Sequence, residues 1–152
     1  MKQSILLLLF LANIYSAETT FEDRATGIKI VIPYDASQKS AGGVNDDNLL
    51  SVAFGSLKNT TVIMLHKKNH TNTNLDDYIG ALKEGMGKSY EIGAIAKAVP
   101  EKLGAGFTLT KANSAVLVYV KKHNDSLAMI TILINDPNLL QAMIEWMHEH
   151  NG

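Results

Sequence analysis

Short segments with alternating or unbroken apolar residues predict the strands of this protein. Residues 26–33 carry isoleucine at every second position and end at a proline, which is typical of a strand with one buried face. Residues 49–56 and 60–68 predict two further strands, and the second is apolar on both faces. A strand with two apolar faces indicates a sheet that is covered on both sides.

Two segments place apolar residues at helical spacing. Residues 74–88 begin with Asn74, a good N-cap, and carry two aspartates in the first turn, where the helix dipole favours negative charge. Their apolar stripe consists of Leu75, Tyr78, Ile79, Leu82 and Met86. Residues 136–152 predict a second helix, with Asp136 as its cap and Pro137 at its first position. Its buried stripe is expected to contain Leu140, Met143, Ile144 and Met147.

Residues 114–134 predict a β-hairpin, because two runs that are apolar on both faces flank a short polar turn. We expect these two runs to be the central strands of the sheet. Residues 106–112 also follow a strand pattern, whereas residues 89–106 fit either a strand followed by a loop or a short helix. Residues 34–48 are rich in Gly, Ser, Asn and Asp, and they predict a long, polar, exposed loop.

The predicted order is three strands, a helix, about three strands and a helix. Runs of strands joined by hairpins favour an antiparallel sheet, and strands with two apolar faces favour helices on both of its sides. The sequence therefore predicts the α+β class, with a mostly antiparallel sheet of about six strands in an α/β/α sandwich. Residues 18–152 contain no repeat, low-complexity tract or linker, so we expect them to form a single domain.

Residues 1–17 predict a cleaved secretory signal peptide. Lys2 gives a positive start, residues 5–11 are an unbroken apolar run, and the small residues Ser16 and Ala17 follow. The apolar run is much shorter than the ~20 residues of a spanning helix, so a permanent membrane anchor is less favoured, as is a buried N-terminal helix. We expect the mature chain to be periplasmic or extracellular, without a stable membrane span.

Composition removes several classes of function. The 152-residue chain is 46% hydrophobic and 19% charged with a formal net charge of -1, so no basic excess favours a nucleic-acid partner. It contains no cysteine, which excludes disulfides, thiol catalysis and thiolate metal sites. The GxSxG and SxxK patterns of hydrolases do not occur, and the glycine-containing segments lack the order of a phosphate-binding loop. The sequence therefore favours a non-enzymatic protein without a cofactor.

Histidines are the candidate metal ligands, namely His66, His148 and His150. His148 and His150 are two positions apart on the predicted last helix, so they point to different sides and cannot chelate one ion together. His66 and His70 would stand about 13 Å apart on an extended strand. A zinc site would need one member of each pair to meet in space. The favoured interpretation is that His66 is solvated and that the histidines in the last helical turn complement the negative end of the helix dipole.

Candidate partner-binding residues lie in the polar loop and on the last helix. The loop contributes Tyr34, Asp35, Asp46 and Asp47. Long polar loops on a rigid scaffold often carry function. The one tryptophan, Trp146, is either part of the core or an exposed anchor for a partner, and the core is favoured because aromatic residues at helical spacing usually pack.

The order of the elements resembles that of the PsbP-like and DcrB-like α/β/α sandwiches. The segments that carry the resemblance are GIKIVIP, the following strand pair, NLDDYIGALKEGMGK, AVLVYVKKHNDSLAMITILI and the last helix. They cover nearly the whole mature chain. The resemblance implies a mostly non-enzymatic accessory, chaperone or binding protein of an exported or membrane-associated system, and it carries over no catalytic motif.

Two functions are therefore open. The first is an exported binding or accessory protein that contacts a protein partner in the envelope. This function includes a chaperone-like or an immunity-like role. The second is a small-ligand carrier or small hydrolase, whose site would be assembled from scattered polar residues such as His66 or His123.

Overall fold

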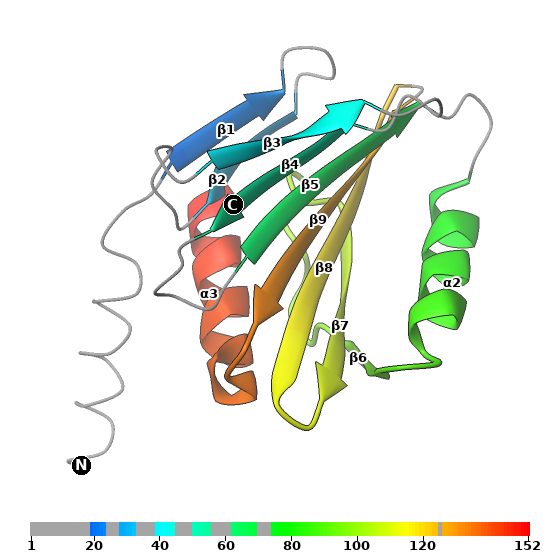
Figure 1. Ribbon diagram of the computed structural model, residues 1–152, viewed down its shortest axis with the longest axis vertical. Helices are drawn as coiled ribbons and strands as arrows, with labels where there is room; N and C mark the ends of the chain where they lie inside the picture. The colour runs from blue at the N-terminus through cyan, green and yellow to red at the C-terminus, as the bar shows by residue number, and fades with distance from the viewer. Residues whose placement is uncertain are drawn as a thin grey trace.

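The computed structural model describes residues 19–23, 28–32, 39–44, 50–55, 62–69, 74–124 and 126–152. Within these residues, seven strands form one antiparallel sheet (Figure 1). Their spatial order is β3 (Lys39–Val44), β4 (Leu50–Gly55), β5 (Val62–Asn69), β9 (Ser126–Ile134), β8 (Ser114–His123), β7 (Ala105–Lys111) and β6 (Glu91–Ala94). Two more strands, β1 (Thr19–Asp23) and β2 (Ile28–Ile32), pair antiparallel in a separate sheet.

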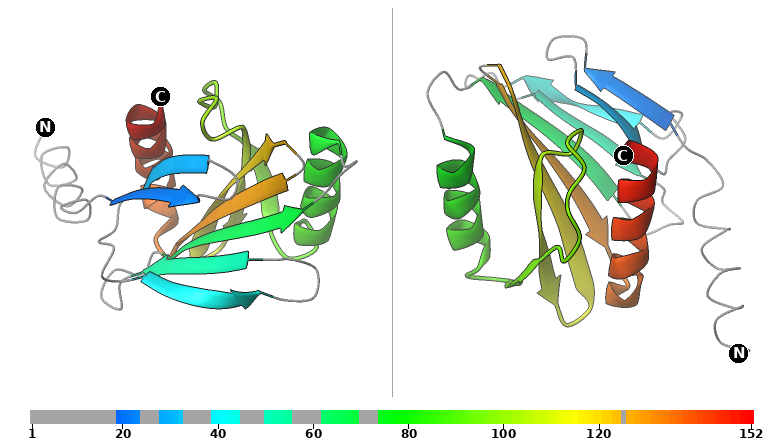
Figure 2. Two further views of the ribbon diagram at one scale, coloured as in Figure 1. Left: turned by 90° about the horizontal axis from the view of Figure 1, so that it is seen from above. Right: turned by 180° about the vertical axis from the view of Figure 1, so that it is seen from behind.

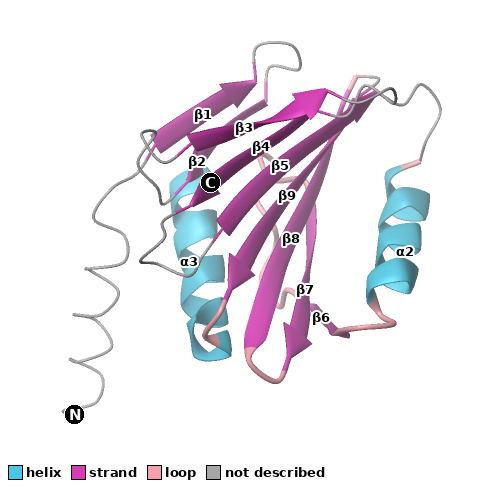
Figure 3. Cartoon of the chain, in the orientation of Figure 1, coloured by secondary structure: helices cyan, strands magenta, loops and turns pink. Residues whose placement is uncertain are grey.

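Two helices lie on opposite faces of the seven-stranded sheet, which gives the fold its α+β class (Figure 2). One helix, α2 (Leu75–Met86), covers β7 and β8. The other, α3 (Leu140–Asn151), follows the short 3-10 turn η2 (Pro137–Leu139) and packs on the opposite face. Figure 3 shows the twisted sheet with one helix on either side of it.

The larger core lies between the sheet and α3. Alternate residues of β8 and β9 are buried there, namely Ala115, Leu117, Tyr119, Ala128, Ile130, Ile132 and Ile134. The helix contributes Met143, Ile144 and Met147, as its apolar spacing predicted. Ile30 and Ile32 of β2 enter the same core, together with Leu103 from the segment between β6 and β7. The β1–β2 sheet is thus held on the α3 face by its own buried isoleucines.

The smaller core lies under α2. It contains Phe107, Leu109, Val118 and Val120, and the predicted apolar stripe of α2 packs on it. Asn74 caps the helix, because its Oδ1 accepts a hydrogen bond from the Asp76 N–H at 2.9 Å. The sequence prediction of this helix, its cap and its packing face is confirmed.

The last helix begins with a tighter turn than its pattern indicated. Asp136 caps η2, since its Oδ1 accepts a hydrogen bond from the Asn138 N–H at 3.0 Å, and Pro137 occupies the first position of that turn. The α-helical part starts at Leu140. The predicted cap and proline position therefore hold for the 3-10 turn rather than for the α-helix itself.

The prediction of about six strands is wrong, because the described residues place seven strands in the main sheet and two in the small one. Part of the difference lies at residues 39–44, which we predicted to be exposed loop. They form the edge strand β3 and pair with β4, with a register shift between Ala41 and Val44. Strand pairing uses main-chain groups that every residue except proline carries in full, so this glycine-rich segment pairs without an apolar pattern.

The other predicted strands are present in the structure, although one of them pairs with a strand that we did not predict. The hairpin at residues 114–134 forms β8 and β9, which lie inside the sheet between β5 and β7. The strand predicted within residues 26–33 exists as β2, but it pairs with β1, a polar segment that we did not predict. Residues 91–94 form β6, so the strand alternative is the correct one for residues 89–106.

Some predictions concern the N-terminal region and membranes. Residues 1–17, the predicted signal peptide, lie outside the described residues. Among the helices that the structure describes, none is long and apolar enough to cross a membrane.

Candidate functional site

A pocket of about 300 Å³ lies where the β1–β2 sheet meets the C-terminal end of α3. Four separate parts of the chain form it: the small sheet, the segment before β7, the end of β8 and the end of α3. Its described lining consists of Thr20, Lys29, Ile30, Val31, Lys102, Lys121, His123, His150 and Asn151. We call it the basic pocket, because five of these nine residues are lysine or histidine.

Asn151 holds one wall of the basic pocket in place. Its side chain is 1% exposed, and its Oδ1 accepts a hydrogen bond from the Val31 N–H at 2.7 Å. Its Nδ2 donates to the Val31 carbonyl at 3.1 Å and to the Met147 carbonyl at 2.9 Å. The amide therefore pairs with β2 as a neighbouring strand would, and it ties β2 to the last turn of α3. Buried polar groups that are paired in this way support a unique geometry.

A tight turn at residues 100–104 brings two lysines together. The Gly104 N–H donates to the Pro100 carbonyl at 3.1 Å, and Gly104 has a φ of +81°, a conformation that glycine adopts without strain. A Cβ on Gly104 would lie 2.9 Å from the Lys121 Cα, so the turn packs closely on β8. Only glycine allows this approach, which brings Lys102 and Lys121 to the lining of the same pocket.

The ammonium groups of these two lysines are held by main-chain oxygens. Lys121 Nζ donates to the Glu101 carbonyl at 3.1 Å, and Lys102 Nζ donates to the Gly152 oxygen at 3.0 Å. The first bond joins β8 to the turn, and the second joins the turn to the end of α3. An ammonium group has three N–H donors, so each lysine keeps donors beyond the bond described here.

Lys29 reaches the basic pocket from β2. Its Nζ lies 3.9 Å from the Glu22 carboxylate on the paired strand, and both side chains are more than half exposed. Exposed ion pairs at such a distance contribute little to stability, typically about 0–1 kcal/mol. Lys29 is therefore only loosely constrained by its partner.

The two histidines of α3 point to different sides, as their spacing predicted. The His150 ring stacks on Trp146 with a centroid distance of 4.0 Å and an interplanar angle of 14°, and its Nδ1 lies 2.8 Å from the Trp146 carbonyl. His150 lines the basic pocket, while Trp146 is half-buried and packs against the larger core. His148 instead faces Tyr119, with ring centroids 5.9 Å apart.

The remaining sequence candidates do not come together in the described part of the chain. His66 lies in β5, in register with Ser51 and Met129. Tyr34, Asp35, Asp46 and Asp47, like His70, lie outside the described residues. Among the residues that the structure describes, no three His, Asp or Glu side chains are grouped so that they could hold a metal ion.

A pair of buried polar atoms lies under the segment between β6 and β7. The Tyr119 hydroxyl and His148 Nε2 are both buried and have no hydrogen-bond partner among the described residues. Burial raises the pKa of the Tyr119 hydroxyl far above its ordinary value. Burial also lowers the pKa of His148, and the nearby positive charge of Lys97 lowers it further. Both groups are therefore kept neutral at neutral pH.

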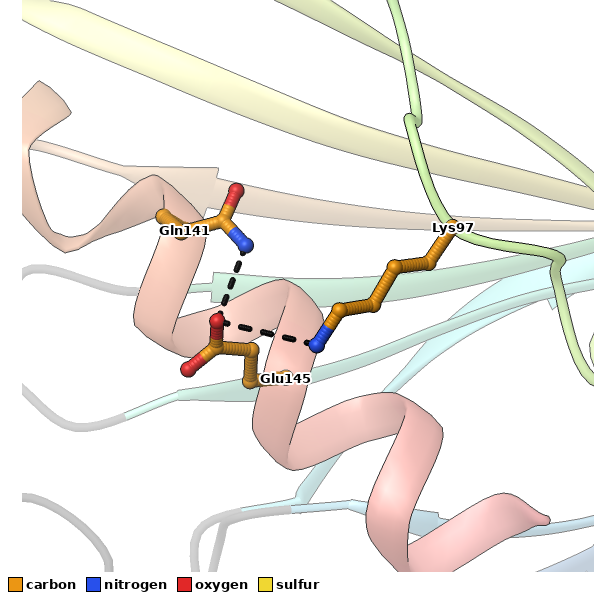
Figure 4. Close-up of polar contacts among 3 residues, drawn as sticks. All are labelled: Lys97, Gln141 and Glu145. Carbon is orange, nitrogen blue, oxygen red and sulfur yellow. Dashed lines mark hydrogen bonds and ion pairs between the residues drawn. The ribbon is translucent and has the colours of Figure 1, made fainter.

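Lys97 lies beside α3 in a small, exposed polar network (Figure 4). Its Nζ lies 3.9 Å from Glu145 Oε1, which also accepts a hydrogen bond from Gln141 Nε2 at 3.0 Å. Glu145 lies one helical turn before His148, so the ammonium group lies on the same side of the helix as the half-buried imidazole.

Acidification is expected to destabilise the protein through His148. A histidine whose pKa is lowered in the folded state stays neutral there at pH values at which the unfolded chain already binds a proton. Its contribution to the free energy of unfolding is therefore present above about pH 6.5 and is lost as the pH falls through the folded pKa. Urea unfolding at about pH 7.5 and about pH 5 measures the loss. The decrease in unfolding free energy between the two pH values should be smaller in His148→Phe than in the wild type. Equal decreases would contradict this role of His148.

The basic pocket was not predicted from the sequence. Lys29, Lys102, Lys121 and Asn151 come from segments that lie far apart in the chain, and no local pattern marks any of them. His123 was considered as a scattered polar residue of an assembled site, and His150 as a metal ligand. Their proximity to the three lysines follows from the fold alone.

Comparison with models of known protein families, with curated proteins and with solved structures finds no match for this chain. The chemistry of the basic pocket is therefore the basis on which a function can be argued.

Proposed function

We propose that this protein is an exported, non-enzymatic binding protein whose ligand enters the basic pocket. The observation that carries the proposal is the convergence of charged and polar side chains from four chain segments on one concave site. Ligand sites in proteins are typically concave and contain a few placed polar groups that orient the ligand. The signal-peptide pattern of residues 1–17 and the resemblance to PsbP-like and DcrB-like α/β/α sandwiches support export and a non-enzymatic role.

The lining favours binding over hydrolysis. Among the described lining residues, one side chain carries a hydroxyl, that of Thr20, and none carries a carboxylate. Thr20 is exposed, whereas a nucleophilic hydroxyl needs an adjacent general base within hydrogen-bond reach. The residues are arranged to attract a ligand.

A small-ligand carrier and a protein-contact accessory differ in what fills the basic pocket. Its volume of about 300 Å³ lies at the lower end of the range for small-molecule sites, roughly 300–1,000 Å³. This size favours a small molecule as the ligand. In the accessory form, an envelope partner would instead insert one of its own side chains into the pocket.

Native mass spectrometry of the mature protein, purified gently from the envelope fraction of its host, tests this function. We expect a non-covalent small-molecule mass on the wild type and its loss in Thr20→Trp, in which an indole at the rim occupies the entrance. Asn113→Trp, in an exposed turn outside the lining, is the matched control and should keep the ligand. A co-purified protein would favour the accessory form. A bare chain in all three samples would contradict the proposal.

A further inference from the structure

We propose that the ligand of the basic pocket is a small organic anion that carries a carboxylate or phosphate group. This inference rests on the proposed function, because it takes the basic pocket as the binding site. It adds the chemical class of the ligand.

The charge of the lining is the first argument. The three lysines, Lys29, Lys102 and Lys121, place three positive charges around one pocket, and His123 and His150 add two imidazole rings. No carboxylate belongs to the described lining. Ammonium groups bind carboxylate and phosphate oxygens through charge-assisted hydrogen bonds, which are stronger than neutral ones. An anion would therefore be attracted, while a cation would be repelled.

The second argument is that two of the cations are held in place before any ligand arrives. Lys102 and Lys121 each donate one hydrogen bond to a main-chain oxygen, at 3.0 Å and 3.1 Å. Fixing a lysine side chain in advance reduces the conformational entropy that binding would otherwise remove. Their further N–H donors can then bind a ligand oxygen with little reorganisation.

The negative groups near the pocket do not cancel this charge. Glu22 lies 3.9 Å from Lys29 and is 57% exposed, so solvent screens that pair. The C-terminal end of α3 contributes the equivalent of about half a negative charge, and a carboxylate at Gly152, whose oxygen Lys102 binds, would add one more, which leaves the three ammonium groups in excess.

The third argument concerns the remainder of the ligand. Ile30 and Val31 of β2 supply an apolar part of the lining next to the cations. An inorganic ion would leave this surface uncovered, whereas an organic anion can place its acid group on the lysines and its apolar part on β2. Burying that apolar part contributes roughly 25 cal/mol per Å².

The test uses four compounds with one benzene ring and different charges: phenyl phosphate, benzoate, benzyl alcohol and benzylamine. Isothermal titration calorimetry of the full mature chain should give the tightest binding for phenyl phosphate, weaker binding for benzoate, and none for the other two. Dissociation constants in the millimolar range are expected for such small probes. Added salt should weaken the binding of both anions.

Two sets of lysine variants locate the site. Lys102→Gln combined with Lys121→Gln should raise the dissociation constant of phenyl phosphate at least about tenfold, since each lost ammonium removes a charge-assisted contact. Lys29→Gln keeps the test informative if the double variant does not fold, because the Lys29 side chain is exposed and its one ion pair within the described part of the chain is with Glu22. The control carries Lys88→Gln and Lys111→Gln, which lower the net charge equally but lie outside the lining.

The outcomes separate the two proposals. Anion binding that is weakened by the pocket variants and not by the control supports the anion class. If benzyl alcohol or benzylamine binds as well as the anions, or if the control weakens binding equally, the anion class is wrong while a binding function stands. If no probe binds, the anion class is again overturned, and the native mass of the purified protein decides the proposed function separately.

Discussion

Asn151→Leu is expected to lower the free energy of unfolding by about 2–4 kcal/mol. Leucine has a similar size, but it removes the three hydrogen bonds that join Asn151 to Val31 and Met147. The part-buried Val31 N–H and carbonyl and the buried Met147 carbonyl would then lose these bonds, and polar groups left unpaired away from water are costly. Urea unfolding, followed by the fluorescence of Trp146 on the same helix, measures the change.

The matched control for this variant is Asn113→Leu. Asn113 lies in an exposed turn between β7 and β8, so its replacement should change the unfolding free energy by less than about 0.5 kcal/mol. Because Asn151 also fixes β2 as a wall of the basic pocket, Asn151→Leu should lose binding of phenyl phosphate under conditions in which it is still folded. A variant as stable as the control would show that β2 does not depend on Asn151.

Ile130→Ala is expected to lower the free energy of unfolding by about 3–5 kcal/mol. Ile130 is fully buried on β9, a strand with neighbours on both sides, and it faces the core under α3. Removing its side-chain carbons loses their burial and leaves a cavity that close packing around it cannot fill. The same urea experiment measures this change.

Ile92→Ala provides the comparison, because the same substitution is made at an exposed site. Ile92 lies on the edge strand β6 and is 38% exposed, so its truncation should destabilise the protein by less than about 1 kcal/mol. Similar losses at both positions would mean that the core is not centred between the sheet and α3.

The helices were predictable because their signals are local. Asn74 and the apolar stripe after it define α2 within a few residues, and Asp136 with Pro137 marks the start of the last helical segment. The hairpin of β8 and β9 was equally clear, since two long apolar runs flank one polar turn. In each case the side chains that specify the element are close neighbours in the sequence.

Two strands, β1 and β3, were missed because their pairing depends on the main chain. Residues 39–44 contain two adjacent glycines and a lysine, a composition typical of loops, yet they lie beside β4 in the sheet. The β1 segment, TTFED, is polar and pairs with β2 outside the main sheet. A neighbouring strand supplies the partner in both cases, and that neighbour cannot be read from the local pattern.

The basic pocket was missed for a related reason. Lys102 lines the same pocket as Lys121 because Gly104 lets the turn approach β8, and Lys29 lines it because Asn151 joins β2 to α3. None of these residues follows a spacing that sequence alone associates with a site. The one sequence hint was that His66 or His123 could join a site assembled from scattered residues, and of these two His123 lines the pocket.

The most direct test of the central claim, that the basic pocket binds an anion, is the NMR spectrum of the histidine ring nitrogens during a titration with phenyl phosphate. The account predicts saturable shifts for His123 and His150, which line the basic pocket, and little change for His148, whose Nε2 is buried beside Tyr119. Unchanged signals of His123 and His150, or shifts of equal size at His148, would contradict it.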